Sequence, residues 1–194
     1  MENFTLQKDK TGLLVIDVQE KLFSKIDRPV EVMESMQKVI RGFQVFDLPI
    51  VVSEQYPQGL GSTIAALKGL FPSNKEYHSK TTFSCCGDAS LRKYLDETLI
   101  KNWILIGIEA HVCVLQTAKD LMRMGCQVTV LNDAISSRSI FDFSTAIAEM
   151  RDIGVRISCV ETVLFELCHD ANSPEFKQIS QLIKESCGSS CSLS

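Results

Sequence analysis

The run Gly12-Leu-Leu-Val-Ile-Asp17 is apolar until it ends on a carboxylate. An uninterrupted apolar run of this length is typical of a strand buried on both faces of a parallel sheet. A helical pattern follows at about 29–46, where apolar residues recur every three or four positions after Pro29. This beginning, a buried strand and then an amphipathic helix, indicates an α/β protein.

The alternation of strands and helices continues along the chain. Further strands are predicted at 48–53, 76–80, 103–107, 127–131 and 155–159, the second of these on a weak pattern. Helices are predicted at 62–70, 88–99 (with Asp88 as cap), 113–124, 140–151 and 174–185. Because such repetition gives right-handed crossovers, we predict a three-layer α/β/α sandwich with a six-stranded, mainly parallel sheet of Rossmann-like order.

A single domain is predicted at 1–187, followed by a short polar tail at 188–194 that we expect to be flexible. No internal repeat or low-complexity segment competes with this organisation. The closing helix carries an apolar stripe that suits either a subunit interface or the protein's own core, formed by Phe176, Ile179, Leu182 and Ile183.

The composition excludes several classes of protein. Lys+Arg 20 against Asp+Glu 24 gives a formal net charge of -4, without the basic excess of a nucleic-acid-binding protein. Hydrophobic residues make up 45% of the chain, which excludes disorder, yet no apolar run reaches the roughly 18 residues of a membrane helix. The N-terminus shows no secretory signal. We therefore expect a cytoplasmic protein that binds neither nucleic acid nor membrane.

The cysteines are expected to be thiols, because the chain lacks an export signal and any Cys-x-x-Cys pair. Cys187 and Cys191 lie four apart in the tail, without the second pair of ligands that a structural zinc site requires. The eight are Cys85, Cys86, Cys113, Cys126, Cys159, Cys168, Cys187 and Cys191.

Three chemically reactive residues fall at predicted strand ends, where open parallel sheets bind their ligands. Asp17 ends the first strand, Lys80 the third, and Cys113 follows the fourth at the start of a helix. A helix N-terminus and a cation lower the pKa of a thiol, a carboxylate takes up its proton, and a lysine keeps that carboxylate ionised. Together they suit hydrolysis of an amide through a thioester. Taken singly, an Asp at a strand end is often only a cap, such a lysine is usually solvated, and such a cysteine more often belongs to the core.

The chain resembles the isochorismatase-like hydrolase superfamily, over about 11–185, in three motifs in register. These are Leu14-Val-Ile-Asp-Val-Gln19, Lys80-Thr-Thr-Phe-Ser84 and Ile106-Gly-Ile-Glu-Ala-His-Val-Cys-Val114. Two further stretches, 53–61 and 132–138, are similar to the short isochorismatase-domain-containing proteins in particular.

The resemblance implies a role for each matched residue. Cys113 matches the nucleophile, Asp17 the general acid and base, and Lys80 the third member of the triad. It also implies a cis peptide between Ile108 and Glu109, which would bring the backbone amides of Glu109 and Cys113 together as an oxyanion hole. Related family members assemble into dimers, tetramers or larger rings, so we expect a homo-oligomer.

A catalytic metal is not expected. Nicotinamidases of this superfamily bind one through an Asp and His residues after the second strand, whereas Ser53-Glu-Gln-Tyr-Pro-Gln58 has no histidine. Glu54 alone cannot hold zinc. Isochorismatase itself cleaves a vinyl ether without a thiol, so Cys113 favours the amidase-like branch, with no cofactor. His111, two residues before Cys113, is expected to be exposed or to cap the helix.

Four residues in loops after the predicted strands are candidates for lining the substrate pocket: Phe23, Gln55, Tyr56 and Phe83. The alternatives are a core position for the two phenylalanines and a surface turn for Tyr56. The sequence thus predicts a cofactor-independent cysteine hydrolase acting on a small amide or related C–N bond. The rival prediction is a non-catalytic binding or scaffold protein that retains the hydrolase fold.

Overall fold

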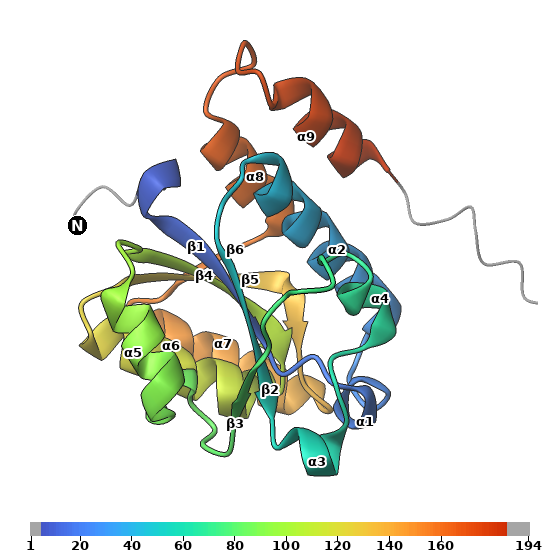
Figure 1. The fold of residues 1–194 in the computed structure, drawn as a ribbon, viewed down its shortest axis with the longest axis vertical. Helices are drawn as coiled ribbons and strands as arrows, with labels where there is room; N and C mark the ends of the chain where they lie inside the picture. Colours follow the sequence, from blue (N-terminus) through green and yellow to red (C-terminus); the bar gives the residue numbers. More distant parts are fainter. Residues whose placement is uncertain (1–4, 186–194) are drawn as a thin grey trace, which may run out of the picture.

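A computed structural model describes residues 5–185, so that the predicted tail at 188–194 lies outside the described residues. Six strands form one sheet in the order β3-β2-β1-β4-β5-β6, and every neighbouring pair is parallel (Figure 1). They are β1 (Thr11–Ile16), β2 (Ile50–Gln55), β3 (His78–Lys80), β4 (Asn102–Ile108), β5 (Gln127–Ser136) and β6 (Arg156–Ser158). The predicted α/β fold class is confirmed.

Helices cover both faces of the sheet, which makes three layers (Figure 1). One face carries α2 (Pro29–Val45), α8 (Val160–Cys168) and α9 (Phe176–Lys184), and the other carries α5 (Ala89–Glu97), α6 (Leu115–Arg123) and α7 (Ile140–Asp152). Short helices and turns complete the chain: η1 (Lys8–Lys10), α1 (Glu20–Phe23), α3 (Pro57–Leu60), α4 (Ala65–Lys68), η2 (Cys85–Gly87) and η3 (Ala110–Val114). None of the helices within residues 5–185 is long and apolar enough to cross a membrane.

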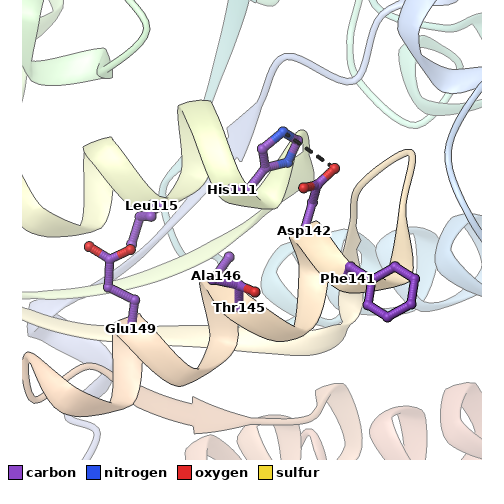
Figure 2. Close-up of a pocket in the computed structure, with 7 residues that line it drawn as sticks. All are labelled: His111, Leu115, Phe141, Asp142, Thr145, Ala146 and Glu149. Atoms are coloured by element: carbon purple, nitrogen blue, oxygen red, sulfur yellow. Dashed lines mark ion pairs between the residues drawn. The ribbon is translucent and has the colours of Figure 1, made fainter.

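The core consists of two apolar clusters, one on each side of the sheet. On β1, Leu13 and Val15 join the cluster under α2, α8 and α9, whereas Leu14 and Ile16 join the cluster under α5, α6 and α7. All four are fully buried, and each such burial stabilises the fold by roughly 1.5–3 kcal/mol. On the second face, α6 and α7 border a surface pocket of about 260 Å³ (Figure 2).

Strand order reverses between β1 and β4, the place where such sheets open a crevice at the carboxyl ends of the strands. There Ile16 pairs with Ser53 of β2 on one side and with Gly107 of β4 on the other. A Cβ on Gly107 would lie 2.4 Å from the carbonyl oxygen of Ile16, so only glycine permits this close approach. Asp17 directly follows Ile16, the last residue of β1.

Several elements differ from the sequence-based prediction. The helix α8 is not among the predicted helices, although its apolar residues recur at helical spacing. It is missed because only Cys159 separates it from β6, so the predicted strand leaves no gap before it. Strand β5 runs on to Ser136, five residues beyond the prediction, because its pairing with β4 resumes after an irregularity between Leu105 and Gly107. The cap at Asp88 is confirmed, since its Oδ1 accepts from the amide nitrogens of Ser90 and Leu91.

Candidate functional site

An ion pair between Asp17 and Lys80 forms the centre of the site. Asp17 follows β1 and Lys80 ends β3, so the lysine side chain crosses β2 to reach the carboxylate. Lys80 Nζ donates to Asp17 Oδ2 at 2.6 Å, and neither side chain is exposed to solvent. A buried pair of this kind persists only when further hydrogen bonds satisfy both groups.

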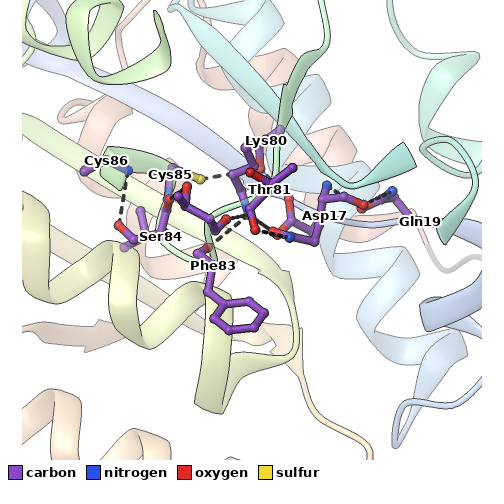
Figure 3. Close-up of polar contacts among 12 residues, drawn as sticks. Asp17, Gln19, Lys80, Thr81, Phe83, Ser84, Cys85 and Cys86 are labelled. Carbon is purple, nitrogen blue, oxygen red and sulfur yellow. Dashed lines mark hydrogen bonds and ion pairs between the residues drawn. The ribbon is translucent and has the colours of Figure 1, made fainter. Parts of the chain in front are cut away.

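Those further hydrogen bonds surround the ammonium group of Lys80 (Figure 3). Its Nζ also donates to Gln55 Oε1 at 2.7 Å and to the carbonyl oxygens of Phe83 at 2.9 Å and Thr82 at 3.2 Å. Burial acts to lower the pKa of Lys80, but the Asp17 carboxylate and the nearby cysteines together raise it above its ordinary value. Lys80 is therefore a fixed positive charge facing Asp17.

Cys113 lies on the other side of Asp17, in η3 directly after β4, and is 4% exposed. Its thiol lies beside the Asp17 carboxylate, and the two groups interact. Burial and the Asp17 charge raise the pKa of this thiol, and Lys80 offsets the rise only in part. The sequence-based expectation of a thiol with a lowered pKa is thus wrong for the resting site. The structure instead pairs a neutral thiol with its candidate base.

The turn before Cys113 has a different backbone from the one predicted. No peptide bond within residues 5–185 is cis, so the cis bond expected between Ile108 and Glu109 is absent from the structure. The chain turns instead because Glu109 adopts a left-handed conformation with φ 55 and ψ 57. The Cys113 amide donates to the Glu109 carbonyl at 3.1 Å, so in this conformation it is already partnered. The predicted oxyanion hole stays a prediction that needs this bond to open.

A second buried thiol and a serine complete the polar cluster, and neither was singled out from the sequence. Ser53 Oγ donates to Asp17 Oδ1 at 2.7 Å, and Cys85 Sγ donates to Ser53 Oγ at 3.5 Å. The backbone amide of Cys85 is in turn held by Thr117 Oγ1 at 3.0 Å. Ile16 pairs with Ser53 in the register of β1 against β2, which puts the serine beside Asp17. The sequence does not predict this register.

The four predicted pocket residues take different places. Gln55 belongs to the buried cluster, whereas Phe23 packs, partly buried, at the edge of the core under α2. The Phe83 ring is 54% exposed and points away from the polar contacts in Figure 3, although the Phe83 carbonyl binds Lys80. Tyr56 is 53% exposed at a left-handed turn. A substrate-lining role for these residues stays a prediction.

His111 faces the surface pocket rather than Asp17, and is partly exposed. Its Nδ1 lies 3.0 Å from Ser137 Oγ, and its Nε2 lies 3.6 Å from Glu109 Oε2 and 3.9 Å from Asp142 Oδ2 (Figure 2). The Glu109 carboxylate, 8% exposed, also meets Arg138, whose Nε is 3.0 Å from Oε1. These contacts connect the turn before Cys113 to the loop after β5 and to the start of α7.

Glu54 and Gln55, at the end of β2, both bind groups of the protein itself. Glu54 Oε1 accepts from both the amide and the hydroxyl of Thr63, at 2.6 and 2.7 Å. Gln55 is bonded to Lys80, as described above. In the described part of the chain, no three His, Cys, Asp or Glu side chains are grouped so that they could hold a metal ion.

Comparison with known sequences gives a consistent family. A protein-family profile described as the isochorismatase domain matches residues 11–162. Isochorismatase domain-containing protein 2A of Mus musculus is 38% identical over 176 residues, which cover 89% of this chain and 82% of that protein.

Solved structures share the fold over nearly the whole chain. The MAR1 ribonuclease from Caenorhabditis elegans is 35% identical with a TM-score of 0.88, covering 98% of this chain and 97% of the other. The YcaC gene product of Escherichia coli, an octameric hydrolase of unknown specificity, has a TM-score of 0.88 at 21% identity, covering 94% and 91%. The latter likeness is one of fold alone.

Proposed function

The chain belongs to the isochorismatase domain family, and on that premise we propose that it is a cysteine hydrolase that cleaves a small amide or a related C–N bond. The observation that carries this proposal is the convergence of Asp17, Lys80 and Cys113 in one buried cluster at the carboxyl ends of the central strands. A thiol beside a carboxylate that is itself bonded to an ammonium group is an arrangement suited to nucleophilic catalysis.

In the proposed reaction the thiol is deprotonated only as it attacks. Asp17 accepts the thiol proton while Cys113 Sγ forms a bond to the carbonyl carbon of the substrate. The C–N bond then breaks, Asp17 returns the proton to the leaving nitrogen, and a thioester remains on Cys113. Water attacks this thioester, gives a proton to Asp17 and releases the carboxylic acid, and Asp17 returns that proton to Sγ.

Lys80 and the backbone have supporting roles in this proposal. The Lys80 ammonium balances the Asp17 charge and keeps the carboxylate directed at the thiol. The amides of Glu109 and Cys113 would bind the oxyanion once the bond from the Cys113 amide to the Glu109 carbonyl opens. One such donor typically contributes about 2.7–4 kcal/mol of transition-state stabilisation.

The direct test is a panel of small primary amides with ammonia release and intact-protein mass as readouts. We expect at least one amide to yield ammonia together with a transient acyl adduct on Cys113. Cys113→Ala should remove both signals, while Cys159→Ala, a half-exposed cysteine outside the cluster, should retain them. A panel that gives neither ammonia nor an adduct contradicts the proposal and favours the non-catalytic scaffold.

A second candidate function is cleavage of RNA, because the 35% identical structure from Caenorhabditis elegans carries the name of a ribonuclease. Against it stand the formal net charge of -4 and a nucleophile that is 4% exposed. Incubating the protein with a labelled single-stranded RNA separates the two candidates. Cleavage that Cys113→Ala abolishes would support the nuclease, and intact RNA would support the amidase.

We further propose that the protein is a homo-oligomer. The octameric assembly of the structurally similar YcaC protein suggests it, as do exposed apolar side chains at the start of α7, where Phe141 is 79% and Ile140 is 52% exposed. Light scattering on the purified chain tests this directly. A monomeric mass at micromolar concentration would contradict the proposal.

A further inference from the structure

Lys80 has to cross a neighbouring strand to reach its carboxylate, and the structure shows what guides it. Strand β2 lies between β1 and β3, so the Asp17–Lys80 pair spans three strands. A lysine side chain has four carbons and three freely rotating donors, and by itself fixes neither length nor direction. Something on β2 must therefore hold the ammonium group in place.

Gln55, which pairs with Lys80 in the β2–β3 register, is placed to do so. Its Oε1 accepts from Lys80 Nζ at 2.7 Å, and its Nε2 donates to the Thr81 carbonyl at 2.8 Å. Both ends of the amide are used, and a flipped amide would point its own N–H groups at an ammonium group. The orientation of Gln55 is therefore determined by its two partners.

Gln19 holds Gln55 in turn, through the backbone. Gln19 Oε1 accepts from the Gln55 amide at 2.8 Å, and Gln19 Nε2 donates to the Gln55 carbonyl at 2.9 Å and to that of Gly61 at 2.7 Å. Strand β1 has ended by then, so the Gln19 side chain continues the hydrogen bonding to β2 that a backbone residue would otherwise provide. Gln19 is fully buried.

We propose that Gln55, held in place by Gln19, is a positioning residue for Lys80 rather than a substrate contact. This inference rests on the proposed function only in treating Lys80 as part of the catalytic site. The four acceptors around Nζ lie on two sides: Asp17 and Gln55 lie toward the centre of the sheet, and the carbonyls of Thr82 and Phe83 lie on the loop after β3. Without Gln55, the loop carbonyls would draw the ammonium group away from Asp17.

Alkylation of Cys113 by iodoacetamide at pH 8 tests the proposal without any substrate. The readout is the rate constant for modification of the peptide that contains Cys113, measured by mass spectrometry. Gln55→Met has a similar shape but no acceptor, so Lys80 should move away and assist formation of the thiolate less. We expect alkylation about three- to tenfold slower, since one pKa unit changes the thiolate fraction tenfold.

Two further variants complete the design. Gln19→Met should slow alkylation in the same direction as Gln55→Met, by a smaller factor. Gln44→Met is the matched control, because exposed Gln44 on α2 donates to the Leu70 carbonyl after α4, and the rate of this variant should equal that of wild type.

The sign of the effect separates positioning from a structural role. A residue that merely supports the fold would, when removed, expose Cys113 and speed its alkylation while lowering the melting temperature. Faster alkylation, or an unchanged rate in Gln55→Met, would overturn the proposal. Because the assay needs no turnover, slower alkylation in a protein that hydrolyses no amide would refute the proposed function and leave the positioning role intact.

Discussion

Two turns on the same face of the sheet each carry a buried cysteine, and both lie near Asp17. In η3, the thiol of Cys113 lies beside the Asp17 carboxylate. In η2, Cys85 reaches the same carboxylate only through the hydroxyl of Ser53. Cys113 is 4% exposed and Cys85 is not exposed at all. Burial raises the pKa of both thiols, that of Cys85 to about 11.

The two turns differ in the group beside each thiol. Neither burial nor proximity to Lys80 distinguishes Cys113, because Lys80 lowers the pKa of both thiols. What distinguishes Cys113, the proposed nucleophile, is a proton acceptor beside its thiol, which would allow the thiol to ionise while it reacts. Cys85 has a hydroxyl as its partner, and a hydroxyl that already donates to Asp17 is a poor base.

The largest expected effect is on kcat/KM, which should depend on Cys113 and not on Cys85. Cys113→Ala should reduce kcat/KM by at least about 10³-fold, because no other group can form the thioester. Cys85→Ala should leave kcat/KM within about tenfold of wild type, since its thiol makes no contact with the reacting atoms. Steady-state kinetics on the best amide of the panel check both values. Equal losses in the two variants would mean that the two thiols act together.

Removing Asp17, the proposed base, should remove the feature that distinguishes Cys113 from Cys85. Asp17→Asn keeps the shape of the side chain but cannot take up a proton, so kcat should fall by about 10²–10⁴-fold. Steady-state kinetics measure this loss, and circular dichroism verifies that the fold is retained. Activity within tenfold of wild type would show that the thiol loses its proton to another group.

The positive charge of Lys80, which acts on both thiols, can be tested through the stability of the protein. Lys80→Met leaves Asp17 buried without its counter-ion, which typically costs about 3–5 kcal/mol. The free energy of unfolding in urea should fall by this amount. The double variant Asp17→Asn/Lys80→Met should recover part of it, because no uncompensated charge remains. A double variant as unstable as Lys80→Met alone would contradict this account of the ion pair.

The smallest expected effect is that of Cys85 on how the free energy of unfolding changes with pH. The folded state raises the pKa of Cys85 from 9.0 to about 11, so folding favours the neutral thiol. Its contribution to stability is complete below the ordinary value and is lost as pH rises toward 11. Between pH 9 and 11, Cys85→Ala should flatten the decline of the unfolding free energy by up to about 1.4 kcal/mol per pH unit. Cys159→Ala is the control, and an unchanged slope in Cys85→Ala would contradict the prediction.

Much of the fold and part of the candidate site could be predicted from the sequence. Asp17, Lys80 and Cys113 could be grouped because the ends of parallel strands meet at one edge of a sheet, whatever the details of packing. Even the weak pattern at 76–80 gave a strand, β3, whose last residue is Lys80.

The remaining parts of the site depend on features that sequence patterns do not carry. The contacts of Ser53 and Gln55 with Asp17 and Lys80 follow from the register of β2 against β1 and β3, which the sequence pattern does not specify. The left-handed turn at Glu109 involves no glycine and so gave no signal. The raised pKa of the Cys113 thiol reflects its burial beside a carboxylate, which spacing along the chain does not reveal.

The residues that directly follow β1 and β4 are both acidic and both lie in the left-handed region, with φ 54 at Asp17 and φ 55 at Glu109. For residues other than glycine, this conformation typically costs about 1–2 kcal/mol. Glycine would remove this cost at both positions, but it would also remove one carboxylate that bonds Lys80 and another that meets Arg138. At Asp17, glycine would leave a buried lysine without its counter-ion, which typically costs about 3–5 kcal/mol and outweighs the relief of the turn. Thermostabilised variants that keep both acids will therefore have to gain their stability elsewhere in the molecule.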